Sequence, residues 1–170
     1  MYGRSHAEEA THPSFGPIKQ LAQQVQYMLD PDDQDVWLFG ENLFGIHSIE
    51  YDALESYFYL FGVLRGATWA AWDEVERMAE VVGVPTAPLL FRGRVASLEE
   101  VERWMSSRLH SESSRAGGAH PEGYVLRVAR EFQGQEFERC VAKFVRAGHI
   151  QTDETWRRTW KAAKLGKGKI

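Results

Sequence analysis

Hydrophobic residues recur at steps of three and four in three segments of the chain, which is the spacing of one buried helix face. We therefore expect helices over 17–29, 72–82 and 98–109. A glycine follows the second segment and a Ser-x-x-Glu capping box opens the third, so both have a defined boundary. We also expect residues 156–165 to form a last helix.

Aromatic and β-branched residues crowd four other segments, as is typical of strands. Residues 36–39 and 57–63 are predicted to be buried strands, and 124–128 and 139–145 are predicted to be the two strands of a hairpin. Strands and helices follow one another without regular alternation. This order favours an α+β fold over a doubly wound parallel sheet.

Composition places the chain among globular proteins of one domain. It has 170 residues, of which 44% are hydrophobic and 12% aromatic. No apolar run is long enough for a membrane helix, and the first residues contain no apolar stretch typical of a secretory signal. We therefore expect a cytoplasmic protein.

The single cysteine, Cys140, cannot form an internal disulfide, and no Cys or His partners at ligand spacing indicate a zinc site.

Charge is distributed unevenly along the sequence. The formal net charge is −4, but residues 156–170 contribute +6, so residues 1–155 carry −10. Tryptophan and basic residues alternate in this tail, a pattern that suits contact with an RNA backbone. An ordinary basic helix end is the alternative. The RNA contacts predicted here are Arg157, Arg158, Lys161 and Lys164.

Three apolar segments, 38–42, 121–127 and 141–146, each contain charged residues. A buried charge needs an opposite charge, a metal or a polar ligand, although a single charge at a strand end can also reach solvent. A nucleoside triphosphate would satisfy the whole set: carboxylates bind ribose and a divalent cation, cations neutralise phosphate, and an aromatic ring stacks on the base. No Gly-x-x-x-x-Gly-Lys-Ser/Thr occurs, so a P-loop is excluded.

These segments resemble a known family when they are taken in order. Gly40-Glu41, the aromatic strand ending in Phe61, the run 122–127 and Lys143 are similar to motifs III, IIIa, IV and V of the covalent nucleotidyltransferases, above all their RNA ligase branch. The run 3–6, which contains Arg4, resembles motif Ia. The resemblance extends from residue 3 to about residue 155.

The resemblance implies the fold, the domains and the substrates. The fold would be a nucleotidyltransferase (adenylation-domain) fold, with two antiparallel sheets flanked by helices and incomplete at the N-terminus. Residues 1–155 would form this RNA ligase-like domain, and 156–170 a basic C-terminal helix and tail. In this family ATP reacts with a lysine to form a lysyl-adenylate, AMP passes to an RNA 5'-phosphate, and a 3'-hydroxyl displaces it. The cofactors would be ATP and Mg²⁺, and the partner RNA.

The resemblance also assigns roles to single residues. Arg4 would contact the nucleotide or nucleic acid, and Glu41 would bind the ribose. Phe61 would stack on adenine, with Phe58 of the same strand as the alternative. Two residues would be catalytic: Glu122, which would position the metal, and Lys143, which would contact the α-phosphate. Arg146 lies beside the position of the family's second motif V lysine and could also neutralise phosphate.

Motif I, the Lys-x-Asp/Asn-Gly that carries the nucleophile, does not occur before motif Ia. Lys19 is the only lysine before Lys143, and it lies after motif Ia in a predicted helix. We therefore expect a shortened RNA ligase domain that cannot adenylylate itself in this form. The alternative is a non-catalytic nucleotide- or RNA-binding module.

Overall fold

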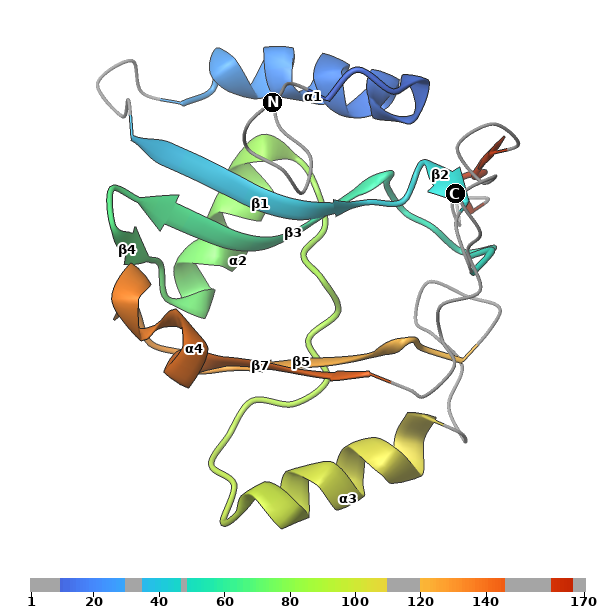
Figure 1. The fold of residues 1–170 in the computed structure, drawn as a ribbon. Helices are drawn as coiled ribbons and strands as arrows, with labels where there is room; N and C mark the ends of the chain where they lie inside the picture. Colours follow the sequence, from blue (N-terminus) through green and yellow to red (C-terminus); the bar gives the residue numbers. More distant parts are fainter. Residues whose placement is uncertain (1–9, 30–34, 47–48, 110–119, 146–159, 167–170) are drawn as a thin grey trace.

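The computed structural model describes residues 10–29, 35–46, 49–109, 120–145 and 160–166. Helices and short strands are mixed along the chain, as the predicted α+β class requires (Figure 1). The helices are η1 (Pro13–Phe15), α1 (Gly16–Gln26), α2 (Trp72–Val82), α3 (Leu98–Leu109), η2 (Gly134–Glu136) and α4 (Phe137–Cys140). The strands are β1 (Val36–Asn42), β2 (Gly45–Ile46), β3 (Phe58–Arg65), β4 (Thr68–Trp69), β5 (Gly123–Arg127), β6 (Phe132–Gln133), β7 (Val141–Val145) and β8 (Lys161–Ala162).

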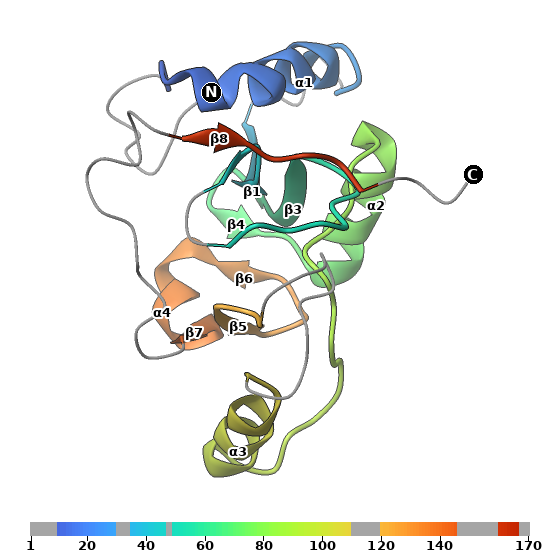
Figure 2. The same ribbon diagram turned by 90° about the vertical axis from the view of Figure 1, so that its right-hand side faces the viewer.

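The named strands form small antiparallel sheets. A four-stranded sheet has the order β1-β3-β4-β6, and β5-β7 and β2-β8 form two-stranded ribbons. We expected two antiparallel sheets, and the described residues form three. In both side views, the β5-β7 ribbon lies between the four-stranded sheet and α3, while α1 lies at the far end (Figures 1 and 2).

The three helices predicted from hydrophobic periodicity are confirmed. In α2 the periodic positions Val75, Met78 and Val82 are all buried, and Gly83 ends the helix in the left-handed conformation with φ of 69°. In the capping box of α3, the Ser97 hydroxyl accepts a hydrogen bond from the Glu100 amide at 3.2 Å. The Glu100 carboxylate reaches the amide of Ala96, one residue earlier than the standard motif.

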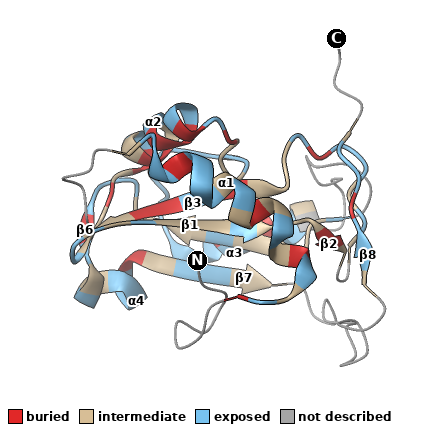
Figure 3. Ribbon diagram, turned by 90° about the horizontal axis from the view of Figure 1, so that it is seen from above, coloured by how far each residue is buried: buried red, intermediate tan, exposed pale blue. Residues whose placement is uncertain are grey.

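One face of the four-stranded sheet packs against α1 and α2 and forms the main core. Leu60 and Val63 of β3 are fully buried there against Val75 of α2 and Val25 of α1. Buried residues therefore concentrate on β3 and α2 (Figure 3). Burial of each such aliphatic side chain stabilises the fold by about 1.5–3 kcal/mol.

The second face of the sheet carries an aromatic cluster. Trp69 of β4 lies 4.7 Å from Phe39 of β1 and 5.2 Å from Phe137 of α4, measured between ring centroids. It also stacks on Phe132 of β6 at 6.3 Å. The cluster attaches β6 and α4 to the sheet, and the ribbon strand β7 follows α4 directly.

The predicted pairing of the ribbon strands is confirmed, but their connection is not a simple hairpin turn. Gly123 pairs with Val145 and Arg127 with Val141 in antiparallel register. Between the strands the chain forms β6, η2 and α4, so Arg139 and Cys140 are helical and not part of β7. The reason is that Phe132 and Phe137 pack on Trp69, which draws this segment to the larger sheet.

The prediction of a last helix over 156–165 is wrong for residues 160–165, which are the part of it that the structure describes. Lys161–Ala162 form β8, which pairs with β2, and Leu165 bridges to Leu54. The amide of Ala163 donates to the carbonyl of Phe44 at 2.7 Å, and its side chain is buried against Leu54 and Tyr59. Pairing with a distant strand thus replaces the local helical bonds. Residues 156–159 lie outside the described residues.

None of the helices in the described part of the chain is long and apolar enough to cross a membrane.

Gly123 provides a test of the ribbon's geometry. A Cβ at this position would overlap the carbonyl oxygen of Phe144 on the paired strand, so backbone must shift. We expect Gly123→Ala to lower the free energy of unfolding by about 1–3 kcal/mol in urea denaturation. Gly16→Ala is the control because no atom lies within 4 Å of its added Cβ, and its stability should stay equal or rise slightly. A Gly123→Ala variant as stable as the wild type would contradict the pairing of Gly123 with Val145.

Candidate functional site

Glu41 and Phe61 lie on the face of the four-stranded sheet opposite α1 and α2. Leu38 of β1 packs against the helical core, and side chains alternate along a strand, so Glu41 points to the other face together with Phe39. The register between β1 and β3 shifts at this point: Phe39 pairs with Gly62 and Gly40 with Leu60. Phe61 is the bulged residue between them.

The bulge explains why Phe61 is exposed in the middle of a buried strand. Leu60 and Gly62 are buried on either side, whereas 40% of Phe61 remains exposed. Bulges next to functional sites often re-aim a side chain in this way. Phe58, the alternative for stacking, packs against the helical core, and its ring fills the space above Gly40. Of the two rings, only Phe61 shares a face with Glu41.

Lys143 lies on the ribbon face that is turned toward this sheet. Its cross-strand partner is Val125, and the side chain two residues further along β5, Arg127, points to the same face. Arg127 Nη1 donates to the carbonyl oxygen of Phe61 at 3.3 Å, which fixes the direction of that face. Lys143 is exposed, and so is Val125 at 64%. Phe61 and Lys143 therefore lie on facing surfaces of two sheets.

Tyr51 connects Glu41 and Glu122, although the sequence carries no motif that singles it out. Its side chain packs against the cluster of Leu54, Tyr59 and Ala163, and Tyr59 is the cross-strand partner of Glu41. Burial raises the pKa of Tyr51 to about 12, and the charges of Glu122 and Glu41 add to this effect in that order. Both carboxylates thus lie within electrostatic reach of one phenol.

The remaining predicted contacts divide into two groups. Lys161 and Lys164 are exposed at β8 and just after it, on the ribbon that pairs with β2. Next to them, the ring of Trp160 lies 5.6 Å from Phe44 and 5.7 Å from His12. The other predicted contacts lie outside the described residues: Arg4, Arg146, Arg157 and Arg158.

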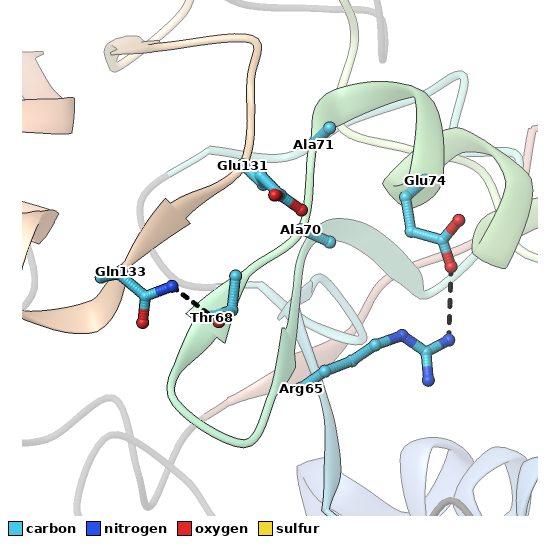
Figure 4. Close-up of a pocket in the computed structure, with 7 residues that line it drawn as sticks. All are labelled: Arg65, Thr68, Ala70, Ala71, Glu74, Glu131 and Gln133. Atoms are coloured by element: carbon cyan, nitrogen blue, oxygen red, sulfur yellow. Dashed lines mark hydrogen bonds and ion pairs between the residues drawn. The ribbon is translucent and has the colours of Figure 1, made fainter.

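A pocket of about 500 Å³ lies elsewhere, where β4 meets the start of α2 and the segment around β6 (Figure 4). Arg65 pairs with Glu74 at 3.2 Å on one side of it, and Gln133 donates to Thr68 at 3.0 Å on the other. Glu41, Phe61 and Lys143, the described residues predicted to bind nucleotide, do not line this pocket. Among the described residues, no group of three His, Cys, Asp or Glu side chains could hold a metal ion.

The titration of Tyr51 tests whether the two carboxylates meet. We expect one phenol with a pKa of about 12, identified by ultraviolet absorbance as the transition that Tyr51→Phe removes. Glu122→Gln and Glu41→Gln should each lower this pKa, because each removes a negative charge that opposes the phenolate. Glu80→Gln on the exposed side of α2 is the matched control. A pKa unmoved by both site substitutions would contradict the shared environment.

The same shift predicts a stability change at high pH. The folded chain holds the Tyr51 proton more tightly than the unfolded chain, in which a tyrosine has its ordinary pKa of 10.0. Its contribution to stability is therefore complete below pH 10 and is lost as the pH rises through about 12. In alkaline unfolding experiments, Tyr51→Phe should show a smaller loss over this range than the wild type does.

Comparison with known protein families gives a match that covers most of the chain. The family model described as RNA ligase matches residues 2–145, a span that includes Glu41, Phe61, Glu122 and Lys143. No curated protein and no solved structure matches the chain. Because the family model covers most of its length, this chain belongs to the RNA ligase family.

Proposed function

We propose that the chain binds ATP between the four-stranded sheet and the β5-β7 ribbon, in an adenylation-domain fold of the nucleotidyltransferase type. Phe61 stacks on adenine, Glu41 accepts hydrogen bonds from the ribose hydroxyls, and Lys143 contacts the α-phosphate. The observation that carries this proposal is the exposed Phe61 at the β-bulge, on the face turned toward exposed Lys143. The match of residues 2–145 to the RNA ligase family supports it.

The chemistry of the three groups suits a nucleotide better than it suits a protein core. A base stacked on an aromatic ring gains about 1–3 kcal/mol. By contrast, an exposed phenylalanine flanked by buried residues gains little from its own fold. Lys143 provides a compact cation whose charge a phosphate can pair. One ligand with an aromatic base at one end and phosphates at the other explains both exposures.

Glu122 would hold Mg²⁺ together with the phosphate oxygens of the nucleotide. Magnesium usually keeps several waters and takes only one or two protein carboxylates in such sites, so the residues present fit it without a larger cluster. When bound, the ion would neutralise charge on the phosphates. Glu122 lies within electrostatic reach of Tyr51, as Glu41 does, and this supports a common site.

A non-catalytic nucleotide-binding module is the second candidate, and the position of Lys19 favours it. Lys19 belongs to α1, which packs through Val25 on the core face of the sheet, opposite the face of Phe61. It is the only lysine that precedes Lys143 in the sequence. We therefore propose that this polypeptide binds ATP without forming a lysyl-adenylate of its own.

Calorimetric titration with ATP and with adenosine tests the binding proposal. Phe61→Leu should weaken both ligands by about 10-fold, since stacking is lost for both. Lys143→Met should weaken ATP only, because adenosine has no phosphate. Phe91→Leu, another exposed aromatic residue, is the control and should bind both ligands normally. Wild-type affinity in the Phe61 variant would contradict the assignment of the base site.

Incubation with ATP labelled at the α-phosphate and Mg²⁺ separates a non-catalytic binding module from an RNA ligase that adenylylates itself. The non-catalytic proposal predicts no covalent adduct on this chain. A labelled lysine found by peptide mapping would overturn it and restore self-adenylylation.

RNA is the proposed partner, and the proposed contacts are Arg157, Arg158, Lys161 and Lys164; Arg4 and Arg146 are proposed to contact the nucleotide. Phosphate neutralisation makes such binding depend on salt. For single-stranded RNA, replacing both Lys161 and Lys164 by Gln should reduce the slope of log K against log salt by about 0.7 for each lost contact. Lys19→Gln is the matched control, and an unchanged slope in the double variant would contradict these contacts.

A further inference from the structure

We propose that Arg127 is a positioning residue that holds the β5-β7 ribbon against β3, so that Phe61 and Lys143 act on the same nucleotide. The inference rests on the proposed nucleotide site and adds to it a residue that contacts no ligand. It follows from the contacts of one guanidinium with three backbone carbonyls.

The hydrogen bonds of Arg127 join three segments. Nη2 donates to the carbonyl of Ala70 at 2.7 Å, just before α2, and Nη1 donates to the carbonyl of Phe61 on β3 at 3.3 Å. Nε donates to the carbonyl of Val128 at 3.3 Å, next to its own strand. One side chain on the ribbon thus holds both the site strand and the start of a core helix.

The bond to Phe61 meets a need that the bulge creates. Phe61 has no cross-strand partner on β1, because the register passes from Gly62 directly to Leu60. A bulged residue is left unpaired by the ladder, so its carbonyl oxygen is open to another donor. This bond therefore joins the ribbon that carries Lys143 to the strand of the residue that presents its ring to the nucleotide.

The surroundings of the guanidinium are built to hold it in place. It lies over the ring of Trp72 at 5.7 Å and over that of Phe132 at 5.5 Å. Burial lowers the pKa of Arg127, and the Cys140 thiol opposes this effect. Burial of a cation costs free energy unless its donors are bonded, so this arrangement depends on the three carbonyls. The N–H groups of the Arg127 guanidinium donate to backbone carbonyls of the protein, whereas Lys143 is exposed.

The distance from Arg127 to Lys143 is short enough for one to position the other. Lys143 is the cross-strand partner of Val125, and Val125 precedes Arg127 by two residues, or about 6.6 Å along the strand. A paired strand moves as a unit over such a length. Release of Arg127 from β3 would therefore change the separation of Lys143 from Phe61.

Calorimetric titration of the full chain with ATP and with adenosine tests this role. Adenosine needs only the sheet residues, whereas ATP also needs Lys143 on the ribbon. We expect Arg127→Met to weaken the binding of ATP roughly 10-fold and to change that of adenosine by no more than about twofold. ATP would then lose most of its advantage in affinity over adenosine. Arg130→Met, which removes an exposed arginine of the next turn, should leave the ratio of the two dissociation constants unchanged.

A double-mutant cycle with Lys143→Met gives the second readout. If Arg127 acts through Lys143, Arg127→Met should weaken ATP no further once Lys143 is replaced. Additive losses would overturn the inference, because they would make the two residues independent. General destabilisation alone does not predict this coupling, so the cycle separates positioning from a purely structural role.

Thermal melts decide how the variants are interpreted. Where Arg127→Met does not fold, Arg127→Lys carries the test, because lysine keeps the charge but cannot bond two carbonyls with a planar fork. Loss of folding in both would overturn the inference by making Arg127 a requirement of the whole fold. A preserved ATP-to-adenosine ratio in a folded variant would overturn this inference alone. Equal affinities for ATP and adenosine in the wild type would overturn the proposed function as well.

Discussion

The bulged pairing of β1 with β3 is the constraint on which the rest of the structure depends. Because the bulge adds one residue between them, Leu60 and Val63 both face the helical core although they lie three positions apart, and alternation along β1 turns Glu41 to the opposite face. The extra residue at Phe61 lets a large aromatic side chain leave the sheet without breaking the core on its other side. One irregularity in the ladder thus keeps the core residues of β3 on one face and places Phe61 on the other face with Glu41.

The second layer of the site is held by interactions that are weak individually but directed at the same place. The aromatic cluster around Trp69 attaches α4, from which β7 continues, and Arg127 ties β5 to β3. Trp69 and Arg127 are both partly buried, whereas a pair of surface charges contributes only about 0–1 kcal/mol. The ribbon's position therefore depends on Trp69 and Arg127 more than on surface charge.

Local patterns predicted what local interactions determine. The periodicity and boundary signals of 72–82 and 98–109 predicted α2 and α3, and the crowding of aromatic and β-branched residues predicted the strands that carry Phe61 and Lys143. Pairings between distant segments were not predictable in the same way. The strand at Lys161–Ala162 depends on β2, more than a hundred residues earlier, and overrides the helical expectation. The bulge at Phe61 and the carbonyl partners of Arg127 likewise depend on how distant segments pair, which local sequence patterns do not show.

The central claim is that adenine lies on Phe61 and not in the polar pocket beside β4. Intermolecular nuclear Overhauser effects between adenine protons of bound ATP and assigned side chains test it most directly. The account predicts effects to the ring protons of Phe61, with phosphate-induced shifts at Lys143. Effects to Thr68 and Gln133, which line the other pocket, without any to Phe61, would contradict it.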